Sequence, residues 1–267
     1  MKGLVAEGGF VEIKHTKGSS KGTGEREQNS ETLAAVNVSR EIPFPELPEK
    51  MIVAIDGWAQ TGKNTSGELV ARHLGGVLVD SGRFYRALTA ACLQAGVDIG
   101  NNEAVSAWCK KAALDVRLAE EGGVVEEAQV AVNRRWFTKE ELKQVGLQTS
   151  LVAAVPDVRE LVNTTLRLCE CYGRVVMLGR DIAGVVFPHT PFKFFLDATE
   201  EVREQRHVKS TNARGAKKRD IYDQSRVIFT EDSLMIDTSK LEPGEVSGII
   251  LVEVFWRADT SKRTNAS

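Results

Sequence analysis

From Met51 onward, the hydrophobic and polar positions of this chain alternate between short apolar runs and amphipathic stretches. Residues 51–55 form a continuous apolar run, typical of a strand buried on both faces, and an amphipathic stretch through Leu74 follows after a Gly-containing turn. The alternation predicts further strands and helices at residues 77–79, 81–95, 157–171, 175–178, 192–196, 234–236 and 243–256. Strands that alternate with helices predict an α/β fold, in which a parallel β-sheet core is flanked by helices on both faces.

The regular alternation of predicted strands and helices is interrupted between about residues 97 and 148. Val124, Val130 and Val132 suggest short antiparallel strands, while residues 105–114 have a helical pattern. We interpret this segment as a small insertion into the α/β domain rather than as a separate fold.

The two ends of the chain differ from the middle. Residues 1–50 contain a Gly/Ser/Lys run at 17–24 and closely spaced prolines at 43–48, which predict a flexible extension followed by a stiff linker. A short strand at residues 10–13 is the alternative within this extension. The domain is expected to span residues 51–257, followed by a disordered tail at 258–267.

Composition excludes several classes of function. The 267 residues are 42% hydrophobic and 27% charged, with a formal net charge of -2, which gives no reason to expect nucleic acid or anionic lipid as a partner. No stretch approaches the roughly 18 apolar residues of a membrane span, and Glu7 lies where a secretory signal would be apolar. We therefore expect a cytoplasmic protein that does not bind membranes and acts as a monomer.

Cysteine and histidine offer little material for catalysis. The chain has 4 cysteines and 4 histidines, and neither set has the spacing of a metal site or of a disulfide framework. We expect the cysteines to be reduced packing residues. The chemistry is therefore expected to depend on Lys, Arg and Asp, with a metal ion carried in by a substrate.

The turn after the first predicted strand fits the phosphate-loop pattern G-x-x-x-x-G-K. In this pattern, backbone N–H groups surround a phosphate at a helix N-terminus, and the lysine adds a mobile positive charge. The turn follows an apolar strand and opens a helix, which is the context that the motif requires. The candidate ATP-binding residues are Gly57, Trp58, Ala59, Gln60, Thr61, Gly62, Lys63, Asn64 and Thr65.

The eighth position of the pattern departs from the rule, because Asn64 stands where a Ser or Thr hydroxyl would bind Mg²⁺. A carboxamide oxygen can bind a hard cation, but Mg²⁺ tolerates little departure from octahedral geometry. Thr65 does not simply substitute, since the next helical residue points about 100° away. Asp56, at the end of the strand, either holds a metal-bound water or is a turn-forming residue before Gly57.

Several segments in order resemble the bacterial cytidylate (CMP/dCMP) kinases, from about Met51 to Phe255. The clearest are D-S-G-R-F-Y-R-A-L at residues 80–88 and G-R-D-I at 179–182. The other similar segments are A-I-D-G at 54–57, residues 133–138, S-L-V-A-A-V-P-D-V-R at 150–159, the late strands at 195–198 and 236–239, and Arg219-Asp220 with Asp223 and Arg226.

The resemblance implies a P-loop kinase fold with a nucleoside-monophosphate-binding insertion at about 97–148 and a short mobile lid at about 203–226. It implies that ATP and CMP or dCMP are the substrates, with Mg²⁺ bound to ATP. Lys63, Arg180, Arg219 and Arg226 would then be catalytic. The implied CMP-binding residues are Ser81, Tyr85, Arg86, Ser150, Arg159, Arg180, Asp181, Arg219, Asp223 and Arg226.

Each of these positions also has a structural explanation. Ser81 is a favoured helix cap, Arg180 and Asp181 are a possible ion pair, and the basic run of the lid is equally a solvated helix face. Gln60 and Leu178 are further departures from the family, because Gln60 replaces a glycine and Leu178 replaces an acidic residue. The lid is also shorter than usual.

The sequence therefore predicts an enzyme that transfers the γ-phosphoryl group of ATP to CMP or dCMP. A degenerate P-loop protein that binds nucleotide without turnover is the alternative, with Gln60 and Asn64 as its markers. A kinase for UMP or another small acceptor is a third possibility.

Overall fold

The computed structural model describes residues 46–121, 125–146, 148–211 and 227–265. Its strands are β1 (Met51–Gly57), β2 (Val77–Asp80), β3 (Leu114–Glu121), β4 (Val125–Val132), β5 (Arg135–Trp136), β6 (Arg174–Leu178), β7 (Phe192–Asp197) and β8 (Leu234–Asp237). Its helices are α1 (Lys63–Leu74), α2 (Ser81–Gln94), α3 (Asn102–Cys109), α4 (Lys139–Gln144), α5 (Thr149–Val152), α6 (Pro156–Leu168), α7 (Glu200–Thr211) and α9 (Pro243–Asn265). A 3₁₀ turn, η1 (Cys169–Tyr172), and a π-helical turn, η2 (Ile182–Val186), complete them.

The described strands form an eight-stranded sheet in the order β3-β4-β2-β6-β1-β7-β8, with β5 paired to β4. The neighbouring strands β4, β2, β6, β1, β7 and β8 pair in parallel, whereas the β3–β4 and β4–β5 pairs are antiparallel. The central strands β2, β6, β1 and β7 are buried almost throughout, because a parallel sheet is covered on both faces. The predicted α/β fold with a parallel core is confirmed.

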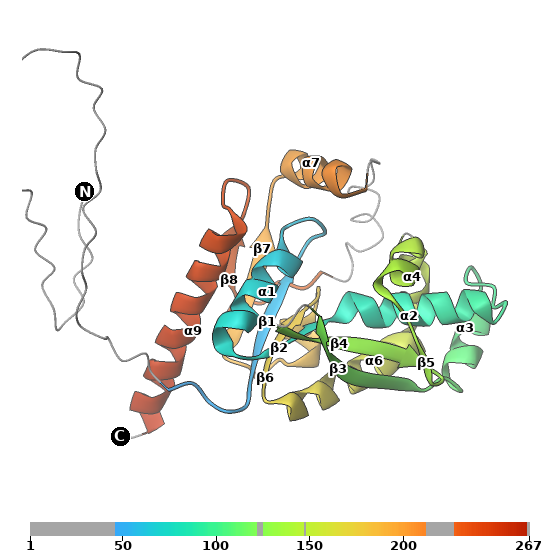
Figure 1. The fold of residues 1–267 in the computed structure, drawn as a ribbon, viewed down its shortest axis with the longest axis horizontal. Coiled ribbons are helices and arrows are strands. Elements are labelled where there is room, and N and C mark those ends of the chain that lie inside the picture. The colour runs from blue at the N-terminus through green and yellow to red at the C-terminus, as the bar shows by residue number, and fades with distance from the viewer. Residues whose placement is uncertain (1–45, 122–124, 147, 212–226, 266–267) are drawn as a thin grey trace, which may run out of the picture. The chain divides into compact units, whose positions relative to one another are not determined.

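Alternation along the central strands divides the core into two clusters. Ile52 and Ala54 face a cluster that includes α2, α3 and α6, whereas Val53 and Ile55 face a cluster that includes α1 and α9. Successive side chains of a strand point to opposite faces, so one apolar run supplies both clusters. In Figure 1, α1 and α9 lie side by side on one side of the sheet.

The insertion between α2 and α5 extends the main sheet. Its hairpin, β3–β4, joins the edge of the core because Leu78 of β2 pairs in parallel with Glu127 of β4. Antiparallel strands were predicted here, and the pairing explains why the segment adds no core of its own: Val130 and Val132 belong to the cluster around α2. The helix α3 is shorter than the predicted helix at 105–114.

The borders of the domain are wider than predicted. Leu47, assigned to the linker, packs against the α1–α9 cluster, and Arg174 donates hydrogen bonds to the carbonyl oxygens of Leu47 and Pro48. The predicted disordered tail is wrong for residues 258–265, because α9 continues to Asn265 and buries Ala258 one turn after Val254. The predicted flexible extension at 1–45, with its strand at 10–13, lies outside the described residues.

The four cysteines are all free thiols. Cys92, Cys109 and Cys169 are buried, as expected of packing residues, and burial raises the pKa of Cys92 to about 12. Cys171 is exposed, so packing does not explain it. Among the described residues, no helix is long and apolar enough to cross a membrane.

Candidate active site

Three adjacent strands end at the same place in the sheet. β2, β6 and β1 are neighbours, and their register aligns Asp80, Leu178 and Ile55 across the sheet. The chain leaves these strands as the start of α2, as the turn at 179–181 and as the phosphate loop. The carboxyl ends of parallel strands are the usual location of a ligand site in α/β folds.

A cavity of about 330 Å³ lies where these segments meet, with further walls from α5 and α6. Its volume is typical of a small-molecule site, for which about 300–1,000 Å³ is usual. The lining residues are Ala59, Gln60, Gly62, Lys63, Asn64, Asp80, Ser81, Gly82, Tyr85, Arg86, Gly146, Thr149, Ser150, Ala153, Arg159, Gly179, Arg180 and Asp181. Four cationic side chains therefore face two carboxylates, so the cavity favours anions.

The phosphate loop depends on two glycines. A Cβ at Gly57 would lie 2.1 Å from the carbonyl oxygen of Leu196, because β7 passes directly against this residue. Gly62 has φ +90° and caps α1 without a side-chain hydrogen bond. The first N–H groups of α1 therefore face the cavity at the positive end of the helix dipole.

Lys63 is folded over its own loop. Its Nζ donates to the carbonyl oxygen of Gly57 at 2.8 Å and also to the carbonyl oxygen of Trp58. The ammonium group therefore lies beside the loop where a donor phosphate is predicted, and it contributes to the positive charge of the cavity wall.

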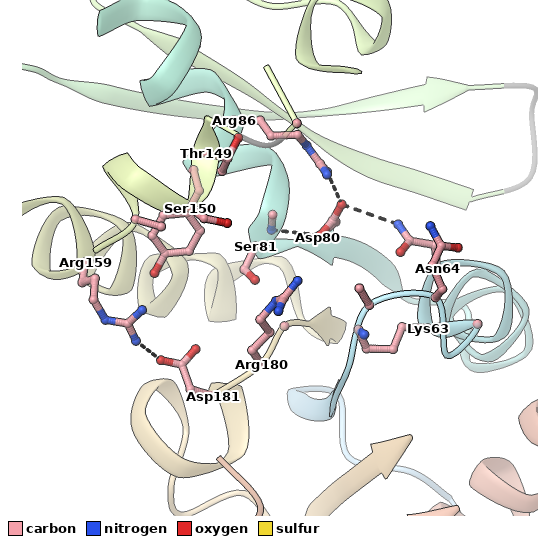
Figure 2. Close-up of a pocket in the computed structure, with 18 residues that line it drawn as sticks. Lys63, Asn64, Asp80, Ser81, Arg86, Thr149, Ser150, Arg159, Arg180 and Asp181 are labelled. Carbon is pink, nitrogen blue, oxygen red and sulfur yellow. Dashed lines mark hydrogen bonds and ion pairs between the residues drawn. The ribbon is translucent and has the colours of Figure 1, made fainter. Parts of the chain in front are cut away.

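Asp80 connects the phosphate loop to α2. Its carboxylate accepts hydrogen bonds from the Gly82 N–H at 2.9 Å and from Arg86 Nη2 at 2.7 Å, and Asn64 Nδ2 lies 3.5 Å away. Figure 2 shows this chain of contacts from Asn64 to Arg86. Burial opposes ionisation of Asp80, but the charges of Arg86 and Arg83 and the hydrogen bond from Gly82 outweigh it and lower the pKa.

Asp80, rather than Ser81, is the N-cap of α2. The interpretation of Ser81 as a helix cap is therefore wrong. Ser81 is the first residue of the helix and is 6% exposed, with its side chain lining the cavity.

The far wall contains a second charged pair. Asp181 forms an ion pair with Arg159 of α6 (Figure 2). The pair ties the turn after β6 to α6. Arg180 lines the cavity as well, and its carbonyl oxygen accepts a hydrogen bond from the N–H of Ile228 at 2.8 Å.

Asp56 lies buried between the end of β1 and the turn after β6. Its carboxylate is 1% exposed and accepts hydrogen bonds from the N–H groups of Ile182 at 2.9 Å and Ala183 at 2.7 Å. Burial raises its pKa to about 7, although these N–H groups and Lys63 oppose the shift. Asp56 does not line the cavity; it fastens the turn that holds Arg180 and Asp181 to the strand that holds the phosphate loop.

The structure brings most of the predicted site residues together. Gly57, Trp58, Thr61 and Thr65 belong to the loop or to α1 but do not line the cavity, and Thr65 is exposed. Arg219, Asp223 and Arg226 lie outside the described residues. The sequence analysis did not predict Asp80 or Thr149 as site residues. Asp80 is the first residue of the D-S-G segment, so its position could have been recognised from that motif. No motif marks Thr149.

The comparisons with family models and with curated protein sequences point to one family. The family model described as Cytidylate kinase matches residues 53–255. A cytidylate kinase of Roseiflexus castenholzii is 32% identical over 230 residues, which cover 80% of this chain and 98% of the relative. One of Mycobacterium leprae is 34% identical over 214 residues, covering 73% and 92%. This chain belongs to the cytidylate kinase family.

One departure from the cytidylate kinase pattern has a clear structural outcome. Leu178 is 1% exposed and points to the α1–α9 cluster, where a Cβ on Gly67 would lie 2.6 Å from its Cδ2 atom. Its side chain faces α1 and does not line the cavity.

The described residues contain no group of three or more His, Cys, Asp or Glu side chains that could hold a metal ion. The cavity offers instead the carboxylate of Asp80 and the carboxamide of Asn64, whose Nδ2 lies 3.5 Å from Asp80 Oδ2. Mg²⁺ that arrives with nucleotide phosphates needs only one or two protein oxygens and keeps several waters. The carboxylate of Asp80 and the carboxamide oxygen of Asn64 are oxygen ligands of the kind that such an ion takes.

Proposed function

We propose that this protein transfers the γ-phosphoryl group of ATP to CMP or dCMP, giving the diphosphate. One observation supports this most strongly: the phosphate-loop residue Lys63 shares a single cavity with Arg86, Arg159 and Arg180, which come from three other segments. A donor on the loop and an acceptor on the arginines would meet in the same space.

The residue types of the cavity suit phosphoryl transfer. Such reactions depend on positioning and on neutralising charge over the transferred group, with no covalent intermediate. Arg86 and Arg180 offer the fixed fork of donors that matches phosphate oxygens. The acceptor phosphate is already ionised, so no general base is needed, which agrees with the absence of histidine from the cavity lining.

The family resemblance assigns different residues to the base, the phosphate and the sugar of the acceptor nucleotide. Ser150, Arg159 and Asp181 would contact the cytosine base. The residues that would hold the monophosphate are Ser81, Tyr85, Arg86, Arg180 and Arg226. Arg219 and Asp223 would lie towards the sugar. Those of them that the structure describes all line the cavity.

We propose Asn64 and Asp80 as the side chains that face Mg²⁺. The ion, when bound with ATP, would neutralise charge on the donor phosphates. Asn64→Ser is expected to raise turnover about tenfold, because a hydroxyl meets octahedral geometry more easily than a carboxamide. The check is the dependence of rate on Mg²⁺ concentration in both proteins.

A coupled assay with CMP, dCMP, UMP and AMP at saturating Mg-ATP tests the proposal. Turnover with CMP or dCMP well above UMP and AMP is the expected result. ATP binding without turnover of any monophosphate would identify a degenerate binding protein, and turnover of UMP alone would identify another kinase. The cytoplasmic location and the monomeric state stay predictions.

A further inference from the structure

Gln60, in the middle of the phosphate loop, has an unusual backbone conformation. Its φ is +62°, in the left-handed region that glycine occupies freely and that side-chain-bearing residues avoid. Gln60 also lines the cavity beside Lys63. A residue held in a disfavoured conformation at a ligand site requires interactions around it that fix that conformation.

Two successive residues of α7 supply those interactions. The carboxamide Nε2 of Gln60 lies 3.2 Å from Nδ1 of His207, and the carbonyl oxygen of Gln60 accepts a hydrogen bond from Arg206 Nη1 at 3.4 Å. His207 is only 5% exposed, so its ring is buried against the loop. Both the side chain and the backbone of Gln60 are therefore held by the same helix.

The surrounding contacts fix α7 in turn. Arg206 donates to the carbonyl oxygen of Thr238 at 2.7 Å and to its Oγ1 at 3.0 Å. Thr238 Oγ1 contacts the carbonyl oxygen of Thr61 at 3.0 Å. The loop residues 60–61, α7 and the turn after β8 thus form one hydrogen-bonded unit.

We propose that His207 is a positioning residue that holds Gln60, and through it the phosphate loop, in the conformation that binds the donor nucleotide. This inference rests on the proposed function, because it takes the loop as the donor site. Without His207, the loop at Gln60 would relax towards negative φ and turn its N–H groups away from the phosphates. Because the lid predicted from the sequence begins at about residue 203, His207 lies within it, and the contact joins the donor site to the part of the lid that α7 forms.

The pair of residues allows a rescue experiment. His207→Ala and the bulkier His207→Phe are each expected to weaken Mg-ADP binding, measured by calorimetry, about 5- to 10-fold, the size of one lost hydrogen bond. Gln60→Gly supplies the background in which His207 is no longer needed, since glycine adopts positive φ without a partner. In the Gln60→Gly background, His207→Ala is expected to have no further effect.

Three controls separate positioning from general damage. CMP binding is expected to stay unchanged in all variants, and thermal melts show whether each variant folds. The exposed His73 on α1 gives the matched control, and His73→Ala is expected to bind Mg-ADP normally.

Two results would overturn the inference: normal Mg-ADP binding by both His207 variants, or a double variant as weak as His207→Ala alone. A wild type that binds Mg-ADP but does not phosphorylate CMP would instead reject the proposed function, and the rescue pattern would still decide the role of His207.

Discussion

The two halves of the cavity are built differently. The donor half, at residues 57–63, is shaped by backbone: Gly57 lies against β7, Gly62 caps α1, and Lys63 contacts carbonyl oxygens of its own loop. The acceptor half is shaped by charged side chains paired across elements, Asp80 with Arg86 and Arg159 with Asp181. In the donor half, substitutions that change only a side chain are therefore expected to be less damaging than substitutions that disturb the backbone. In the acceptor half, the charge of each paired residue is expected to matter.

The largest effect is expected at Arg180, an arginine that lines the acceptor half of the cavity. Arg180→Met should lower kcat/KM for CMP by about 100- to 1,000-fold, since it removes a donor to the group that gains charge. Steady-state kinetics measure this. Arg72→Met on the exposed surface of α1 is the control, and an equal loss in both variants would contradict the assignment.

In the donor half, a backbone change is expected to act on stability. Gly57→Ala should lower the free energy of unfolding by about 3 kcal/mol or more, because its Cβ would meet the backbone of β7. Gly75→Ala is the matched control: Gly75 has φ +58° and open space around it, so only the conformational cost of about 1 kcal/mol applies. Urea denaturation compares the two, and equal losses would show that the close approach to β7 is unimportant.

Asp56 connects the two halves of the cavity, and its contribution to stability should depend on pH. An unfolded Asp releases its proton near 3.8, whereas burial holds the pKa of Asp56 at about 7 in the folded chain. The folded state therefore binds more protons in this window, so its stability falls as pH rises from about 4 to 7, by about 3 kcal/mol. Denaturation at a series of pH values measures how the free energy of unfolding depends on pH. Asp56→Asn should remove the part of this dependence that Asp56 causes, and an unchanged dependence would contradict the assignment.

The smallest effect is expected from one member of a pair in the acceptor half. Asp181→Asn should raise KM for CMP about tenfold, because Arg159 loses its charged partner, while KM for ATP stays constant. Glu68→Gln, in an exposed pair on α1, serves as the control. If both KM values rose together, the division between the halves would not hold.

Much of this arrangement was predictable, because it depends on local patterns. The apolar run at 51–55 and the Gly-containing turn after it predicted β1, the phosphate loop and α1. The alternation of strands and helices predicted the parallel core. The charged residues after β2 and β6 were predicted as site residues, and the parallel order of those strands places them together.

The remaining features depend on the direction of single side chains and on distant contacts. Leu178 points away from the cavity because alternate residues of β6 face opposite clusters, with Met177 on the other side. Asp56 meets N–H groups more than a hundred residues away, and no spacing in the sequence indicates that contact. The extension of α9 past residue 257 depends on packing of Ala258 rather than on a helix-stop signal.

The most direct test of a shared cavity is calorimetric binding of a compound in which adenosine and cytidine are joined by a chain of five phosphates. If the loop and the arginines face one space, this compound should bind at a single site at least about 100-fold more tightly than ATP or CMP alone, through effective concentration. Both Lys63→Met and Arg180→Met should weaken it. Affinity no better than that of ATP alone, or loss in only one of these variants, would contradict the account.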